Sequence, residues 1–185
     1  MTEFVPGGRR RIDRVLAPDY LDGIDQLTLD EVRERRAEAD QEEVDLSYAR
    51  RLLQGRIDIL RAEQQRRLGG GPALSGGDDA TIVEALKRIL TDERRQDRGG
   101  GRYLGARPTR VGEHRREAER AVADVGGSDL NALDDDHLRD AIARLADIEA
   151  RLSRSRRRVQ GVVDALTGEV ARRYQLDQVS LAERA

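Results

Sequence analysis

Five polar residue types occur twice in this 185-residue chain, each time with the same spacing. The first copy is Glu43, Ser47, Arg50, Gln54 and Asp58, and the second, 106 residues later, is Glu149, Ser153, Arg156, Gln160 and Asp164. The steps of 4, 3, 4 and 4 place each set within an arc of roughly 80° on one helix face, along about 22 Å. Each helix is therefore expected to present a polar stripe.

The residue types of this stripe suit a nucleotide that carries guanine and phosphate. Arginine offers planar donors to phosphate and stacks on bases. A carboxylate accepts hydrogen bonds from the donors on the edge of guanine, and serine and glutamine bond sugar, phosphate or base. If the two helices pack antiparallel, a pseudo-two-fold axis relates the stripes, and a two-fold ligand with guanines and phosphates fits between them.

The surroundings of the two copies also agree. Arg51 matches Arg157, Gly55 matches Gly161, and upstream of the motifs Leu27, Asp30 and Arg33 match Leu133, Asp136 and Arg139. A glycine inside a helix is unfavourable by about 1 kcal/mol relative to alanine. Close approach of a ligand or partner backbone explains such a residue, and a tolerated surface glycine is the alternative.

The elements that must position the stripes are two long helices of a coiled coil. Apolar residues recur every seven positions, as expected for the d positions of heptads. The set comprises Val32, Ala39, Leu46, Leu53 and Leu60, and Leu138, Leu145, Leu152, Val159 and Leu166. The a positions then include Glu43, Arg50, Glu149 and Arg156, where a structural coil carries apolar residues. A single copy would read as a solvated charged face, but repetition of serine and glutamine at equal spacing argues against that reading.

The pattern resembles the signature of the RsiG family of actinobacterial anti-sigma factors, and all ten motif residues match it. The two-copy form is similar to the single-chain members of that family. The resemblance implies that a dimer of cyclic di-GMP binds between the two motif helices, through the ten residues given above. It also implies that the loaded protein holds a sporulation sigma factor of the flagellar-type class.

We predict an all-α fold: an antiparallel coiled coil of two long motif-bearing helices plus a shorter third helix, with flexible termini and glycine-rich loops. Charged residues make up 38% of the chain, aromatic residues 3%, and there is no cysteine. This composition is typical of long helices. A net charge of −2 does not favour DNA binding. Without a signal peptide or an apolar membrane span, we expect a cytoplasmic protein.

The predicted organisation begins with a flexible segment over 1–26, followed by a helical domain over 27–175 and a tail over 176–185. Within the domain we expect helices over about 28–68, 78–96 and 134–174. Thr28 and Glu31 have the spacing of a capping box at the first of these. The helix over 78–96 has an apolar stripe that packs either on the coil or on a partner. A flexible segment is expected over about 99–132, and its residues 113–124 allow a short helix.

Two other function classes compete with a ligand-binding regulator. A structural coiled-coil adaptor without a small ligand is the first alternative. An enzyme is the less favoured one, because the sequence shows neither a metal cluster nor a nucleophile–base pair. The Gly69–Pro72 stretch lacks the lysine of a phosphate-binding loop. Neither His114 nor His137 is spaced from another histidine or a cysteine as metal ligands are, and both are expected at the surface.

Overall fold

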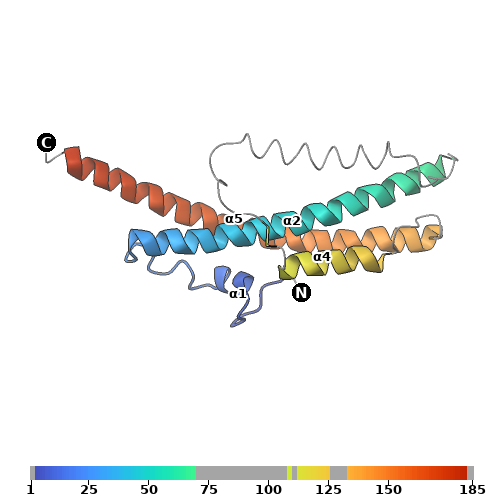
Figure 1. Ribbon diagram of the computed structural model, residues 1–185, viewed down its shortest axis with the longest axis horizontal. Helices are drawn as coiled ribbons and strands as arrows, with labels where there is room; N and C mark the ends of the chain where they lie inside the picture. The colour runs from blue at the N-terminus through green and yellow to red at the C-terminus, as the bar shows by residue number, and fades with distance from the viewer. Residues whose placement is uncertain (1–2, 70–107, 110–111, 126–132, 183–185) are drawn as a thin grey trace.

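The computed structural model of the protein describes residues 3–69, 108–109, 112–125 and 133–182. Within these ranges it consists of α1 (Arg11–Val15), α2 (Leu29–Leu68), α4 (Glu113–Asp124) and α5 (Asp135–Ala182), without a strand. Figure 1 shows α2 and α5 as two long helices side by side, with α1 and α4 along one side of the pair. The helix predicted over 78–96 and most of the segment over 99–132 lie outside the described residues.

The two long helices run antiparallel, as predicted. Near the end of α2, Nη1 of Arg67 donates to the carbonyl oxygen of Leu133 at 2.8 Å, just before α5 begins. At the other end, Nη1 of Arg173 in α5 donates to the carbonyl oxygen of Leu27 at 2.5 Å, just before α2 begins. The predicted all-α fold with an antiparallel pair of motif-bearing helices and a shorter helix is therefore confirmed.

The predicted d positions form the interface between α2 and α5. All ten of these side chains have no solvent-exposed surface, and they are Val32, Ala39, Leu46, Leu53, Leu60, Leu138, Leu145, Leu152, Val159 and Leu166. A repeat of seven keeps one edge of each helix against its partner. Full burial of a leucine or valine side chain stabilises a fold by about 1.5–3 kcal/mol, so this seam supplies much of the stability of the pair.

The ends of the long helices follow local sequence signals. Oγ1 of Thr28 accepts from the Glu31 amide at 3.3 Å, and the Glu31 carboxylate accepts from the Thr28 amide at 2.7 Å. This capping box starts α2 as predicted. At the start of α5, the Asp134 side chain accepts from the His137 amide at 2.8 Å. The predicted end of this helix near residue 174 is wrong, because 175–182 contains no glycine or proline and the helix continues to Ala182.

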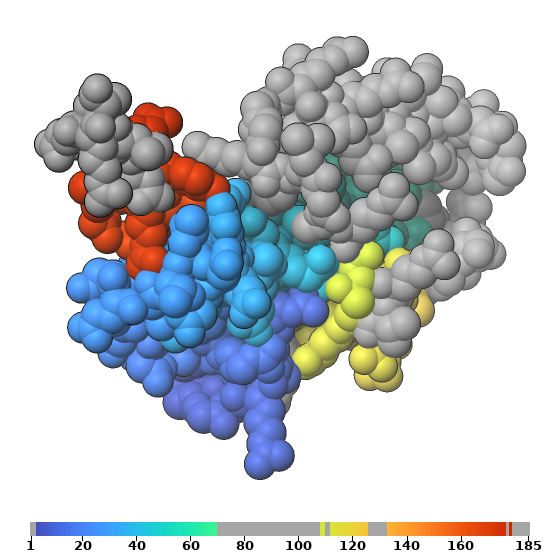
Figure 2. Space-filling model, turned by 60° about the vertical axis from the view of Figure 1, so that its left-hand side comes forward, coloured from blue at the N-terminus to red at the C-terminus, as the bar shows by residue number. Residues whose placement is uncertain are grey.

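The N-terminal segment is not the flexible tail that the sequence predicts. Ile12 and Val15 of α1 are buried in the same core as α2, and Figure 2 shows the segment lying against α2 and next to α4. The Asp13 carboxylate accepts from the guanidinium of Arg10 at 2.7 Å and from the Val5 amide at 2.8 Å. These bonds, with Arg10 as the larger influence, lower the pKa of Asp13 to about 2. A partly buried ion pair therefore fixes the path of this segment.

Helix α4 coincides with the short helix that residues 113–124 allow, and it buries one of the two histidines. His114 Nε2 lies 2.5 Å from Oε1 of Glu42 in α2. Close by, Asp45 of α2 accepts from Nη1 of Arg11 at 2.8 Å. The expected surface position is therefore wrong for His114, because a buried carboxylate distant in the sequence partners it. The expectation is correct for His137, which is exposed.

Candidate functional site

The two motifs meet at the middle of the coiled coil, where each glutamate accepts hydrogen bonds from both helices. Oε1 of Glu43 in α2 accepts from Oγ of Ser47 at 2.8 Å within its own helix. It also accepts from Nη1 of Arg156 at 3.1 Å and from Nε2 of Gln160 at 3.4 Å, both of α5. One buried carboxylate oxygen therefore joins three other motif residues.

Glu149 of α5 stands at the centre of a matching cluster. Its Oε1 accepts from Oγ of Ser153 at 2.9 Å in the same helix and from Nε2 of Gln54 in α2 at 3.0 Å. Nη1 of Arg50 lies 3.7 Å away from this oxygen. The two clusters use equivalent residues in equivalent roles, so the pseudo-two-fold arrangement expected from antiparallel packing is present in the side chains as well as in the helices.

The charged groups in this centre are wholly or partly buried, so they need partners. Glu43 is only 5% exposed, and a buried carboxylate is costly unless charged or hydrogen-bonding groups surround it. Arg50 and Arg156 are partly buried, and their Nε groups are buried without a hydrogen-bond acceptor among the described residues. The centre therefore offers two guanidinium donors that the described side chains do not use, which suits an anionic ligand.

The two motif aspartates lie apart from these clusters. Asp58 and Asp164 are both exposed, and each follows the motif glutamine by one helical turn. The structure thus brings together eight of the ten predicted residues and leaves the aspartates at the ends of the stripes. Both aspartates are exposed at these positions.

The family model described as RsiG-like matches residues 18–90 and 124–185. Together these ranges cover more than half of the chain, and each contains one complete copy of the motif. The chain belongs to the RsiG-like family. Membership indicates an anti-sigma factor role and a sigma factor as the protein partner. No curated protein sequence is significantly similar to the chain.

A second duplicated set in this RsiG-like chain lies outside the motif. Glu63 accepts from Arg66 and Arg67 at 2.6 Å each. At the offset of 106 residues, Glu169 accepts from Arg172 at 2.7 Å and from Arg173 at 2.6 Å. The five-residue motif does not include this set, but the same offset of 106 residues relates its two copies.

These glutamates orient the arginines that close the two ends of the coil. Arg67 and Arg173, each held by its glutamate, are the residues that bond the carbonyl oxygens preceding the opposite helix. The arginine hydrogen bonds lower the pKa of Glu63 and of Glu169 to about 2. We call this set the end clasps. They fix the register of α2 against α5, and register decides which motif residues face each other.

Metal chemistry receives no support from the described part of the RsiG-like chain. No group of three or more histidine, aspartate or glutamate side chains there is arranged to hold a metal ion. Over the same residues, no helix is both long enough and apolar enough to cross a membrane. The centre of the coiled coil provides hydrogen-bond donors and acceptors in a two-fold arrangement, as a binding site requires.

Proposed function

We propose that this protein is an anti-sigma factor that binds cyclic di-GMP between α2 and α5, as a dimer of the nucleotide. The loaded protein sequesters a sporulation or flagellar-type sigma factor and so inhibits transcription. The observation that carries the proposal is the pair of equivalent clusters around Glu43 and Glu149. Cyclic di-GMP is itself two-fold, with a guanine and a phosphodiester in each half.

Binding in this centre requires an exchange of hydrogen-bond partners. The Glu43 carboxylate accepts from Arg156 and Gln160 of the opposite helix. The amino and imino donors of a guanine replace these partners, because a carboxylate accepts both in a paired geometry. The released arginines, with their buried Nε groups, then donate to the phosphodiesters. The ten motif residues are the proposed contacts, and the two exposed aspartates complete each stripe.

The exchange gives the ligand a means to control the partner. Once the nucleotide replaces direct contacts between α2 and α5, it sets the separation of the two helices around the motif. A sigma factor that recognises this separation binds the loaded protein more tightly, and by linkage it tightens nucleotide binding to the same degree. A sigma factor that binds equally well with and without cyclic di-GMP would refute this coupling.

A structural coiled-coil adaptor remains the second candidate, and one observation favours it. Glu43 and Glu149 are already satisfied by partners within the chain. Polar residues at a positions specify the register of a coil at some cost in stability. On this reading the clusters serve to align α2 with α5 and take no ligand.

Titration calorimetry of the purified protein with cyclic di-GMP separates the two candidates, with cyclic di-AMP and GTP as controls. We expect selective binding of about two nucleotides per chain, which Arg50→Ala combined with Arg156→Ala abolishes without loss of helix content. Arg36→Ala is the matched control: it is also an arginine at an a position, but its partner Asp40 lies in its own helix and Ile142 replaces it in the second copy. Absence of binding both with and without the sigma factor would favour the adaptor.

A further inference from the structure

Although the centre of the motif holds two guanidinium groups, the ten motif residues together carry more negative than positive charge. The ten motif residues comprise four carboxylates and two guanidiniums, which gives a net charge of −2. Each cyclic di-GMP molecule brings a negative charge on each of its two phosphodiesters. Charges within the screening length of about 10 Å repel one another at ordinary salt concentrations. Positive groups close to the motif but outside it must therefore offset the repulsion between the motif and the phosphodiesters.

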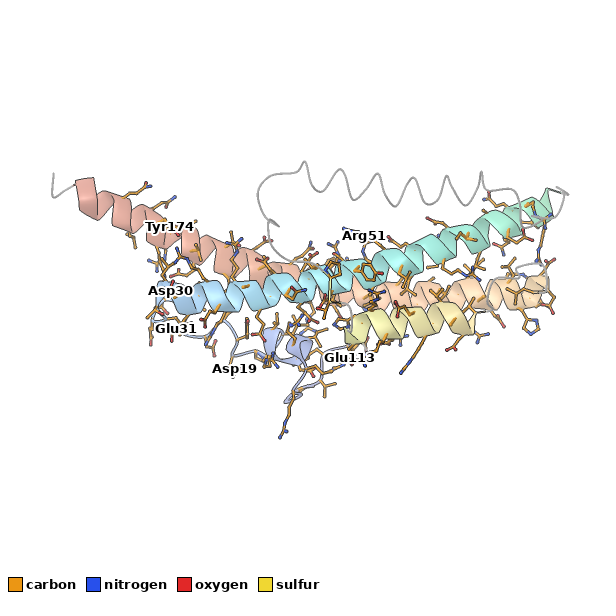
Figure 3. The ribbon with its side chains drawn as sticks, in the orientation of Figure 1. Asp19, Asp30, Glu31, Arg51, Glu113 and Tyr174 are labelled. Carbon is orange, nitrogen blue, oxygen red and sulfur yellow. The ribbon has the colours of Figure 1, made fainter. Side chains whose placement is uncertain are left out.

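Arg51 and Arg157 are the duplicated residues that meet this need. Each follows the motif arginine directly and lies one turn beyond the motif serine, so about 100° of rotation places it at the outer edge of the stripe. Figure 3 shows Arg51 on the side of α2 that faces away from α4, whose first residue Glu113 lies on the opposite side. Arg51 therefore lies on the side of α2 opposite α4, and Arg157 has the equivalent position beside the second copy of the motif in α5.

The setting of Arg157 in α5 is suited to an anion. Its Nε donates to the carbonyl oxygen of Ser153 at 3.2 Å, which holds the guanidinium beside the motif serine. This is its only hydrogen bond to a described residue, and the side chain is exposed. One turn further along, Gly161 is exposed, and a Cβ there would meet no atom within 4 Å. The backbone at Gly161 can thus be approached closely from the side of Arg157.

Neighbouring arginines of α5 are used differently. Arg154 lies 3.6 Å from Glu3, and the Arg158 guanidinium lies over the ring of Phe4 at 5.3 Å. Both contacts tie α5 to the N-terminal segment. Neither arginine is duplicated, because the equivalent positions of α2 hold Tyr48 and Leu52. Only Arg157 of this group combines duplication with a guanidinium placed at the motif.

We propose that Arg51 and Arg157 bind phosphodiester groups of the nucleotide as a second pair of contacts outside the five-residue motif. Gly161 leaves room there for the sugar–phosphate edge. The two arginines bring the charge of the combined site from −2 to zero. This inference rests on the proposed binding of cyclic di-GMP, and the experiment below distinguishes the failure of one from the failure of the other.

The test compares two duplicated pairs by calorimetry with cyclic di-GMP. We expect Arg51→Gln combined with Arg157→Gln to weaken binding at least about tenfold, since charged hydrogen bonds are lost, and to reduce its dependence on salt. Arg33→Gln combined with Arg139→Gln removes the same charge from equivalent positions outside the motif and should change affinity less than about twofold, because salt screens distant charges. Helix content measured by circular dichroism should stay the same in both variants.

The possible results distinguish the failure of the second arginine pair from the failure of nucleotide binding as a whole. If the Arg51 and Arg157 variant binds as the wild type does while loss of Arg50 and Arg156 abolishes binding, the motif site stands and the second pair is refuted. Equal weakening by the control pair would show a general effect of charge and would also refute it. If the wild type binds no cyclic di-GMP with or without the sigma factor, both proposals fall.

Glycine substitutions supply a second measurement that does not alter charge. Gly161→Ala should weaken cyclic di-GMP binding several-fold, because a methyl group occupies the space reserved for the sugar–phosphate edge. Gly168→Ala lies two turns further on the same face, where a Cβ also meets nothing within 4 Å and the first copy already has Ala62. Both substitutions favour the helix by about 1 kcal/mol. Equal affinities of the two variants would contradict the proposed contact.

Discussion

The two halves of the site differ in one respect that double-mutant cycles can measure. Nη1 of Arg156 lies 3.1 Å from Glu43 Oε1 and is hydrogen-bonded to it, whereas Nη1 of Arg50 lies 3.7 Å from Glu149 Oε1. The side chain of Glu43 is 6% exposed and that of Glu149 is 20% exposed. Alanine substitutions of each pair, singly and together, give the coupling free energy of that pair in urea denaturation.

Coulomb attraction alone predicts almost equal couplings. At an effective dielectric constant of about 20, two unit charges attract by about 5 kcal/mol at the shorter distance and by about 4.5 kcal/mol at the longer one, before desolvation offsets most of either value. The hydrogen bond decides the difference, since one that involves charged groups contributes about 1.5–3 kcal/mol. We expect a coupling of about 2 kcal/mol for Glu43 with Arg156 and below about 1 kcal/mol for Glu149 with Arg50.

Equal couplings in the two cycles would refute this reasoning. That result would mean that the two halves exchange between equivalent arrangements in solution, so that neither glutamate keeps the shorter contact. A larger coupling for Glu149 with Arg50 would contradict it as well. Because both cycles use the same substitutions at pseudo-equivalent positions, differences in helix propensity cancel between them.

Two further predictions concern stability. The arginines lower the pKa values of Glu63 and Glu169 to about 2, so the contribution of these glutamates to stability is present above about pH 4.5 and is lost as the pH falls from there towards 2. Urea denaturation at pH 5 and pH 3 should show that Glu63→Gln combined with Glu169→Gln reduces the loss of unfolding free energy between these pH values. A loss as large as in the wild type would contradict the role of the end clasps. His114→Ala should lower the free energy of unfolding by about 1–3 kcal/mol, because the buried carboxylate of Glu42 loses a hydrogen-bond partner. His137→Ala, at an exposed position, should change the free energy of unfolding by less than about 0.5 kcal/mol. Equal effects of the two substitutions would contradict this prediction.

The sequence predicts the coil and most of its site because both depend on periodicity. A spacing of seven places Leu46 and Leu152 in the seam, and the offset of 106 residues aligns Glu43 with Glu149. Periodicity is the same in a parallel and an antiparallel pair, so only the structure confirms the predicted antiparallel direction. The pairing of Glu43 with Arg156 follows from register, which the end clasps help to set and which spacing within one helix cannot reveal.

Contacts that join distant segments escape such analysis. His114 has no partner near it in sequence, and only packing of α4 on α2 brings it to Glu42. The N-terminal segment has too few apolar residues to suggest burial, yet Ile12 and Val15 are in the core. The carbonyl oxygen of Leu27 accepts from Arg173, and a backbone acceptor of this kind leaves no mark in residue identity.

The packing of α1 and α4 against the long helices has a consequence for stoichiometry. Glu42 and Asp45 of α2 bind His114 of α4 and Arg11 of α1, whereas the equivalent positions of α5 are Ile148 and Arg151. Two identical chains, each with one motif, would have to carry the same residues on both flanks. A single chain is free to let its halves diverge, so a symmetric centre acquires two unlike faces. Such a molecule presents a given face once, and it would engage one sigma factor in one orientation.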